Sequence, residues 1–77
     1  MAKNAKVLEY MVMLHADEEY GGYWVEVPSL PGCVSQGKSK EDALKNVKEA
    51  IELHLETLRE DGQELPREES YRVAVHA

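Results

Sequence analysis

Residues 27–43 constrain the fold of this chain more than any other stretch. Pro28 and Pro31 each fix φ and lack a backbone N–H, so neither can continue a central strand. Gly32 follows at once and permits the positive φ that a tight reversal requires. A strand that ends near Pro28 can therefore turn back and restart at Cys33, within a few residues.

The same stretch then predicts the start of one long amphipathic helix, over residues 40–61. Ser39 lies three residues before Asp42, the spacing of a helix N-cap with a capping-box partner. Gly62 stands where a C-terminal capping glycine belongs. Apolar side chains recur between these ends at a spacing of three and four, as expected for one buried face: Ala43, Leu44, Val47, Ala50, Ile51, Leu55 and Leu58.

Three short segments before the helix predict antiparallel strands, at residues 7–16, 22–28 and 33–36. The first has one continuous apolar face, which we expect to meet the helix: Leu8, Tyr10, Val12 and Leu14. Met11 and Met13 lie on its other face and indicate that this face is covered as well.

The residues after the helix predict a closing strand, at 71–76. Tyr71, Val73 and Val75 alternate there with more polar side chains and are expected to face inward. A strand that follows a helix crossover within one sheet should run parallel and right-handed. The predicted order is thus β-β-β-α-β: a single α+β domain over residues 1–77, with a three- to four-stranded sheet packed on one helix.

Size and charge limit what such a domain can do. A chain of 77 residues buries only about 60% of its unfolded surface, and one cysteine offers no intrachain disulfide, so a homodimer or homotetramer is expected. The net charge of −6 makes direct DNA binding unlikely and favours a basic partner. No signal peptide or membrane span is apparent, which predicts a cytoplasmic protein.

No arrangement of side chains predicts chemistry. His15, His54 and His76 lack metal-ligand spacing, and Cys33 has no neighbouring base in a nucleophile motif. We therefore expect no catalytic residue, no metal and no cofactor. Metal-dependent nuclease activity would need several carboxylates to converge, and spacing alone cannot place the candidates together: Glu9, Glu26, Asp42 and Glu49.

Two groups of side chains are candidates for partner binding, each with a structural alternative. Glu49, Glu52, Glu56 and Glu60 form a stripe along the helix, which either attracts a basic partner or is simply a solvated face. Tyr20, Tyr23 and Trp24 surround the Gly21-Gly22 turn, where they either anchor an interface or fill the edge of the core.

The sequence resembles the HicB-like antitoxin family over about residues 8–66. The resemblance rests on residues 22–37, Gly-Tyr-Trp-Val-Glu-Val-Pro-Ser-Leu-Pro-Gly-Cys-Val-Ser-Gln-Gly, on Ser-Lys-Glu-Asp-Ala-Leu at 39–44, on Glu-Ala-Ile at 49–51, and on Asp-Gly-Gln-Glu-Leu-Pro at 61–66. It implies a truncated RNase H-like fold with no enzymatic activity. It also implies an antitoxin that neutralises a small basic mRNA-cleaving toxin of the HicA type by masking its catalytic histidine.

Many members of that family add a C-terminal DNA-binding module. This chain ends at Ala77, where such a module would begin, so we expect a short single-domain member without one. For toxin binding the hypothesis is a site that contains Tyr23, Trp24, Glu49, Glu52 and Glu56. The alternative is a stand-alone domain that assembles with itself through Met11, Met13 and an edge strand, with no toxin partner.

Overall fold

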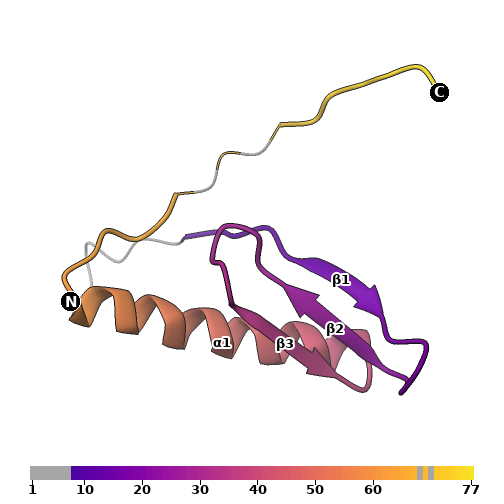
Figure 1. Ribbon diagram of the computed structural model, residues 1–77, viewed down its shortest axis with the longest axis horizontal. Helices are drawn as coiled ribbons and strands as arrows, with labels where there is room; N and C mark the ends of the chain where they lie inside the picture. Colours follow the sequence, from indigo (N-terminus) through magenta and orange to yellow (C-terminus); the bar gives the residue numbers. More distant parts are fainter. Residues whose placement is uncertain (1–7, 68, 70) are drawn as a thin grey trace.

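The computed structural model describes residues 8–67, 69 and 71–77. Three strands, β1 (Met13–Ala16), β2 (Tyr23–Glu26) and β3 (Val34–Gly37), form an antiparallel sheet in the order β1-β2-β3. One helix, α1 (Lys40–Glu60), packs against β3 and β2 on one face of this sheet (Figure 1). The predicted α+β class and the order of the first four elements are confirmed.

A tight turn joins β1 to β2. The backbone N–H of Asp17 donates to the carbonyl of Gly22 at 2.9 Å, which closes the turn. Its carboxylate accepts from the backbone N–H groups of Glu19 and Tyr20 at 3.1 and 3.0 Å, the Asx-turn arrangement that explains an aspartate at this place.

The proline- and glycine-containing loop joins β2 to β3 as predicted. The N–H of Val27 donates to the carbonyl of Cys33 at 3.1 Å, and the N–H of Cys33 donates to the carbonyl of Leu30 at 2.9 Å. These bonds fold the loop back on itself, so that Leu30 is only 1% exposed. The loop therefore contributes a core side chain as well as a reversal.

Both predicted ends of the helix are confirmed. The Ser39 hydroxyl accepts from the N–H of Asp42 at 3.1 Å at the N-terminus, and the N–H of Gly62 donates to the carbonyl of Arg59 at 3.0 Å after the C-terminus. The helix starts very close to the sheet: a Cβ atom at Gly37 would lie 2.3 Å from the backbone nitrogen of Ala43. Glycine at position 37 is what allows this approach.

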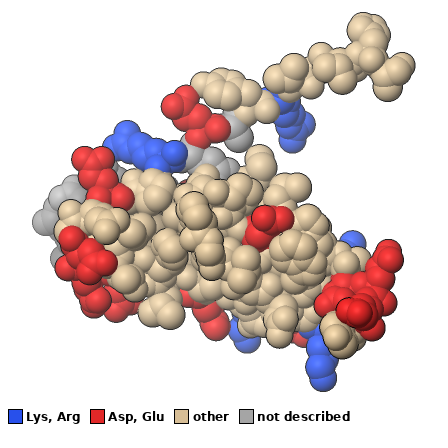
Figure 2. Space-filling model, viewed as in Figure 1, with Lys and Arg blue, Asp and Glu red and all other residues tan. Residues whose placement is uncertain are grey.

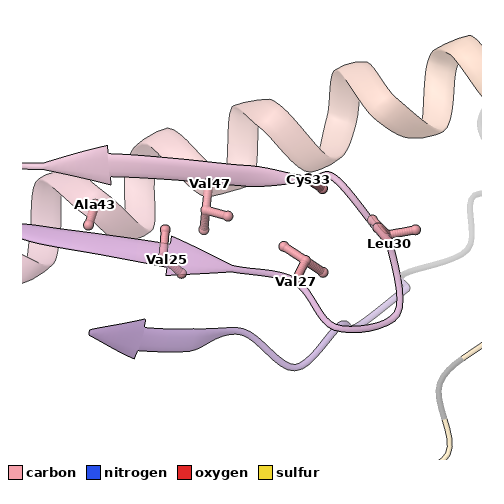
Figure 3. Packing of buried hydrophobic residues seen from close by; sticks show 6 residues of the cluster. All are labelled: Val25, Val27, Leu30, Cys33, Ala43 and Val47. Carbon is pink, nitrogen blue, oxygen red and sulfur yellow. The ribbon is translucent and has the colours of Figure 1, made fainter.

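The core lies between α1 and the β2–β3 hairpin (Figure 3). Six apolar residues are buried there: Val25, Val27, Leu30, Cys33, Ala43 and Val47. Half-buried side chains from all parts of the fold surround them: Tyr10, Val12, Leu14, Tyr23, Ala50, Ile51 and Leu55. The inward face predicted for the first segment is thus confirmed for Tyr10, Val12 and Leu14, which pack toward the helix.

The observed strands are shorter than the predicted ones. The strand expected at 7–16 is observed from Met13, its residues 8–12 are not in a strand, and Val7 lies outside the described residues. The strand expected at 22–28 spans Tyr23–Glu26, and the one expected at 33–36 spans Val34–Gly37.

The closing strand predicted at 71–76 is wrong. Residues 71–77 form no strand, and Tyr71, Val73 and Val75 are 80, 79 and 81% exposed instead of facing inward. The chain before this segment is held beside the lead-in to β1, where the Tyr10 hydroxyl donates to the carbonyl of Pro66 at 2.6 Å. Beyond this point the chain runs away from β1 (Figure 1), so its backbone has no strand to pair with.

Candidate protein-binding site

The sheet face opposite α1 is built from two rows of side chains. Strand register places Met13, Glu26 and Val34 side by side in one row. It places His15, Trp24 and Gln36 in the next row. Because side chains alternate along a strand, these six point away from the buried Val25 and the helix. We call them the outer sheet face.

Trp24 is held at the centre of the outer sheet face. The imidazole of His15 stacks on the indole with ring centroids 4.1 Å apart and an angle of 17° between the planes. The His15 Nε2 atom also lies 2.7 Å from the Glu26 Oε2 atom on the neighbouring strand. A stacked and hydrogen-bonded surround fixes the indole orientation, so little side-chain entropy is lost when a partner binds.

The outer sheet face is not covered by other described residues, contrary to the expectation from Met11 and Met13, and it combines apolar side chains with the carboxylate of Glu26. Met13, Trp24 and Val34 are 45, 38 and 58% exposed, although all three are large apolar side chains. Figure 2 shows that the surface over the strands is mostly tan, with one acidic group near its middle and the other acidic groups gathered toward the two ends of the molecule. Exposed large apolar side chains gathered on one face are typical of a site that binds another protein.

The structure separates the five residues expected to bind a partner. Trp24 lies on the outer sheet face, whereas Tyr23 lies on the opposite face, half-buried against the core, with the Lys40 Nζ atom 5.9 Å from its ring centroid. Glu49, Glu52 and Glu56 are exposed on α1. The set therefore occupies three surfaces.

Sequence reasoning missed four members of the outer sheet face: His15, Glu26, Val34 and Gln36. Alternation along each strand predicts on which face of the sheet these side chains lie. Their distance from Trp24 depends on the register between the strands, and the turn at Asp17 fixes that register for β1 and β2. A register derived from that turn would have paired His15 with Trp24.

Cys33 lies in the core, away from this surface. Burial raises the pKa of the Cys33 thiol, because a thiolate is disfavoured where water is excluded. The thiol is a poor nucleophile there. Among residues 8–67, 69 and 71–77, no group of three or more His, Cys, Asp or Glu side chains could hold a metal ion. Within those same ranges no helix is both long and apolar enough to span a membrane.

A small α+β domain with exposed apolar side chains on one face of its sheet is typical of a protein-binding module. Comparison with known proteins names the family. Residues 10–76 match the model of the HicB-like antitoxins of bacterial toxin–antitoxin systems. The chain therefore belongs to the HicB-like antitoxin family.

Individual relatives agree with this assignment. A UPF0150 protein of Thermoplasma acidophilum is 44% identical over 70 residues, which cover 91% of this chain and all of the relative. The crystal structure of the Burkholderia pseudomallei antitoxin HicB superposes with a TM-score of 0.72 at 38% identity, over 84% of this chain and 48% of that one. The structure of the N-terminal domain of the same antitoxin gives a TM-score of 0.67 at 40% identity, over 78% and 69% of the two chains. This chain thus spans about half of the solved antitoxin.

Proposed function

We propose that this chain is an antitoxin that binds a small basic mRNA-cleaving toxin of the HicA type and occludes the toxin's active site. Membership of the HicB-like family supports this proposal. The observation that carries it in the structure is the uncovered outer sheet face, with Trp24 held at its centre by His15. Occlusion needs surface complementarity and no catalysis, so the chain acts without turnover. A toxin that cleaves mRNA implies that the complex forms in the cytoplasm.

Trp24 is the proposed anchor of the complex. Tryptophan is enriched among the few interface residues that dominate binding energy, and such residues lie near the centre of the interface. Met13 and Val34 lie diagonally from it on the adjoining strands, on either side of Glu26, and can exclude water from that side of the indole. Truncation of such an anchor costs about 2 kcal/mol or more of binding energy, which is roughly a 30-fold weaker complex.

The helix acids are proposed to speed the encounter with a basic toxin. Glu49, Glu52 and Glu56 are exposed on α1, in a chain whose net charge is −6. Charges outside the buried centre of an interface act mainly on the association rate and are screened by salt. We therefore assign them a steering role rather than a place in the contact around Trp24.

Tyr23 is proposed to contribute through the fold of β2. It lies on the face of that strand opposite to Trp24, so a partner that covers the outer sheet face does not reach its ring. Its half-buried ring packs against the core cluster instead. Removal of Tyr23 should lower the stability of the strand that carries Trp24.

Calorimetry with the basic protein encoded beside this chain tests the proposal. Trp24→Ala should raise the dissociation constant roughly 30-fold, whereas Tyr20→Ala, an exposed aromatic at the hairpin tip, should leave it unchanged. In stopped-flow mixing at low salt, Glu52→Lys should slow association more than Glu18→Lys, which makes the same charge change in the hairpin turn. If Trp24→Ala binds as tightly as the wild type while its circular dichroism is unchanged, the outer sheet face is not the toxin site.

A second candidate function is self-assembly without a toxin. Met11 and Met13 favour it, since they are 49 and 45% exposed on the side of the N-terminal segment that faces away from the helix. The absence of any basic protein in the neighbouring reading frame, together with a multimer that captures no host protein, would favour this function over the antitoxin.

A further inference from the structure

A single carboxylate, that of Glu26, lies among the apolar side chains of the outer sheet face. The strand register places it between Met13 on β1 and Val34 on β3, which are 45 and 58% exposed. None of the six residues of this face is a lysine or an arginine. The Glu26 carboxylate can bind water in the free chain, but its charge becomes costly when another surface excludes that water.

The imidazole of His15 satisfies only part of this carboxylate. An ionised carboxylate accepts hydrogen bonds and cannot donate them, so the His15 Nε2 atom donates to the Glu26 Oε2 atom across their 2.7 Å contact. The Oε1 atom keeps its lone pairs for another donor. A neutral imidazole also leaves the negative charge unbalanced. A partner that covers the outer sheet face avoids the cost of burying this charge if it supplies both a donor and a positive charge here.

The neighbouring indole makes this point better suited to arginine than to lysine. Trp24 and Glu26 are two residues apart on β2, so their side chains leave the same face of the sheet. The imidazole that reaches Glu26 also stacks on the indole at 4.1 Å between ring centroids, which places the carboxylate beside the stacked rings. A guanidinium is planar, stacks on aromatic rings and forms paired hydrogen bonds with a carboxylate, whereas an ammonium group is a compact, strongly hydrated charge.

We propose that Glu26, Trp24 and His15 form a binding site for one arginine side chain of the basic partner protein. The guanidinium donates to the Glu26 Oε1 atom and lies against the exposed part of the indole, while His15 holds both the ring and the carboxylate in place. The inference rests on the proposed function, because the arginine belongs to the toxin that the outer sheet face binds. It specifies which side chain the surface of that toxin presents opposite Trp24.

Such a site selects among partners by charge as well as by shape. A phosphate or an acidic side chain brought to this point is repelled by Glu26, so the outer sheet face fits neither a nucleic-acid backbone nor an acidic peptide. An uncharged side chain at the same place buries the carboxylate without a counter-charge, which disfavours a partner that lacks the arginine. Glu26 is therefore the proposed determinant of specificity, and Trp24 remains the proposed anchor.

The arginine site can be tested without a toxin, because Trp24 is the only tryptophan of the chain and its indole N–H resonance reports on this site alone. The probes are N-acetylarginine amide, N-acetyllysine amide and N-acetylcitrulline amide, the last of which has the shape of arginine without its charge. The arginine probe should shift the indole resonance saturably, with a dissociation constant roughly threefold or more below that of the lysine probe. The citrulline probe should cause no saturable shift.

Glu26→Gln is the variant that tests the carboxylate. Its amide oxygen can still accept from His15 on a half-exposed side chain, so the fold should be kept while the charge is lost. It should weaken binding of the arginine probe roughly fivefold or more. Glu18→Gln loses the same charge on an exposed residue of the hairpin turn and should leave the dissociation constant within about a factor of two. In the toxin complex, Glu26→Gln should raise the dissociation constant roughly 30-fold.

The two arms separate this inference from the proposed function. A chain that binds the arginine probe as described but binds no basic toxin keeps the arginine site and loses the antitoxin proposal. A chain that inhibits the toxin but shows no saturable shift with the arginine probe keeps the antitoxin proposal and loses the arginine site. The inference is also overturned by a lysine or citrulline probe that binds as tightly as the arginine probe, or by Glu26→Gln binding either the arginine probe or the toxin like the wild type.

Discussion

Gly37→Ala tests the close contact between the sheet and the first turn of α1. Gly37 does not have a positive φ. Alanine in place of glycine at such a position ordinarily stabilises a protein by about 0.4–1 kcal/mol, because it restricts the unfolded chain. Here the added Cβ would lie 2.3 Å from the nitrogen and 2.8 Å from the Cα atom of Ala43. These are backbone atoms of a helix, so the overlap is relieved only when the helix moves by about an ångström, and the sign of the effect should reverse.

The expected loss is about 3 kcal/mol, the upper end of the usual range for overpacking. For a domain of this size it lowers the melting temperature by roughly 10–20 °C, and it is a large part of a total stability of about 4–12 kcal/mol. Urea unfolding followed by the helix signal, at one fixed protein concentration, measures it. Gly32→Ala is the control: its φ is +86° but nothing lies within 4 Å of the added Cβ, so it should cost only about 1–2 kcal/mol. A neutral or stabilising Gly37→Ala would refute the described packing of helix on sheet.

Two further predictions concern single side chains. Ser39→Ala removes the hydroxyl that accepts from the N–H of Asp42 and should cost about 1 kcal/mol in urea unfolding, whereas Ser39→Asp should keep most of the stability. An unchanged stability in Ser39→Ala would show that the cap contributes nothing. Burial raises the pKa of Cys33, so the thiol should label slowly in the native protein and rapidly in denaturant. In the unfolded chain the thiol loses its proton at a lower pH than in the folded protein. The thiol's contribution to folding stability should therefore be constant below the ordinary thiol pKa and decrease as the pH rises through the raised pKa. Cys33→Ala should remove this part of the pH dependence.

The parts of the fold that local chemistry determines could be predicted from the sequence. Ser39 and Gly62 define the two helix ends because capping involves only neighbouring residues, and Pro28, Pro31 and Gly32 define the loop between β2 and β3 for the same reason. The inward direction of Tyr10, Val12 and Leu14 followed from alternation alone.

The other features depend on contacts between distant parts of the chain. The pattern at residues 71–76 is that of a strand, but a strand also needs a neighbouring strand, and this segment runs away from β1 (Figure 1). Alternation along β2 already places Tyr23 and Trp24 on opposite faces of the sheet. The stacking of His15 on Trp24, in contrast, could be predicted only from the register of the hairpin. Surfaces are assembled across strands, so spacing within one segment could not identify them.

The central claim is that this chain acts by covering a toxin surface. It is tested most directly by titrating the purified chain against mRNA cleavage by a HicA-type toxin, which the neighbouring reading frame should encode. Cleavage should decrease in proportion to added chain and stop at a fixed stoichiometric ratio, and Trp24→Ala should require a much higher concentration for the same inhibition. Undiminished cleavage at saturating chain, or inactivation of the toxin by far less than a stoichiometric amount, would contradict the claim.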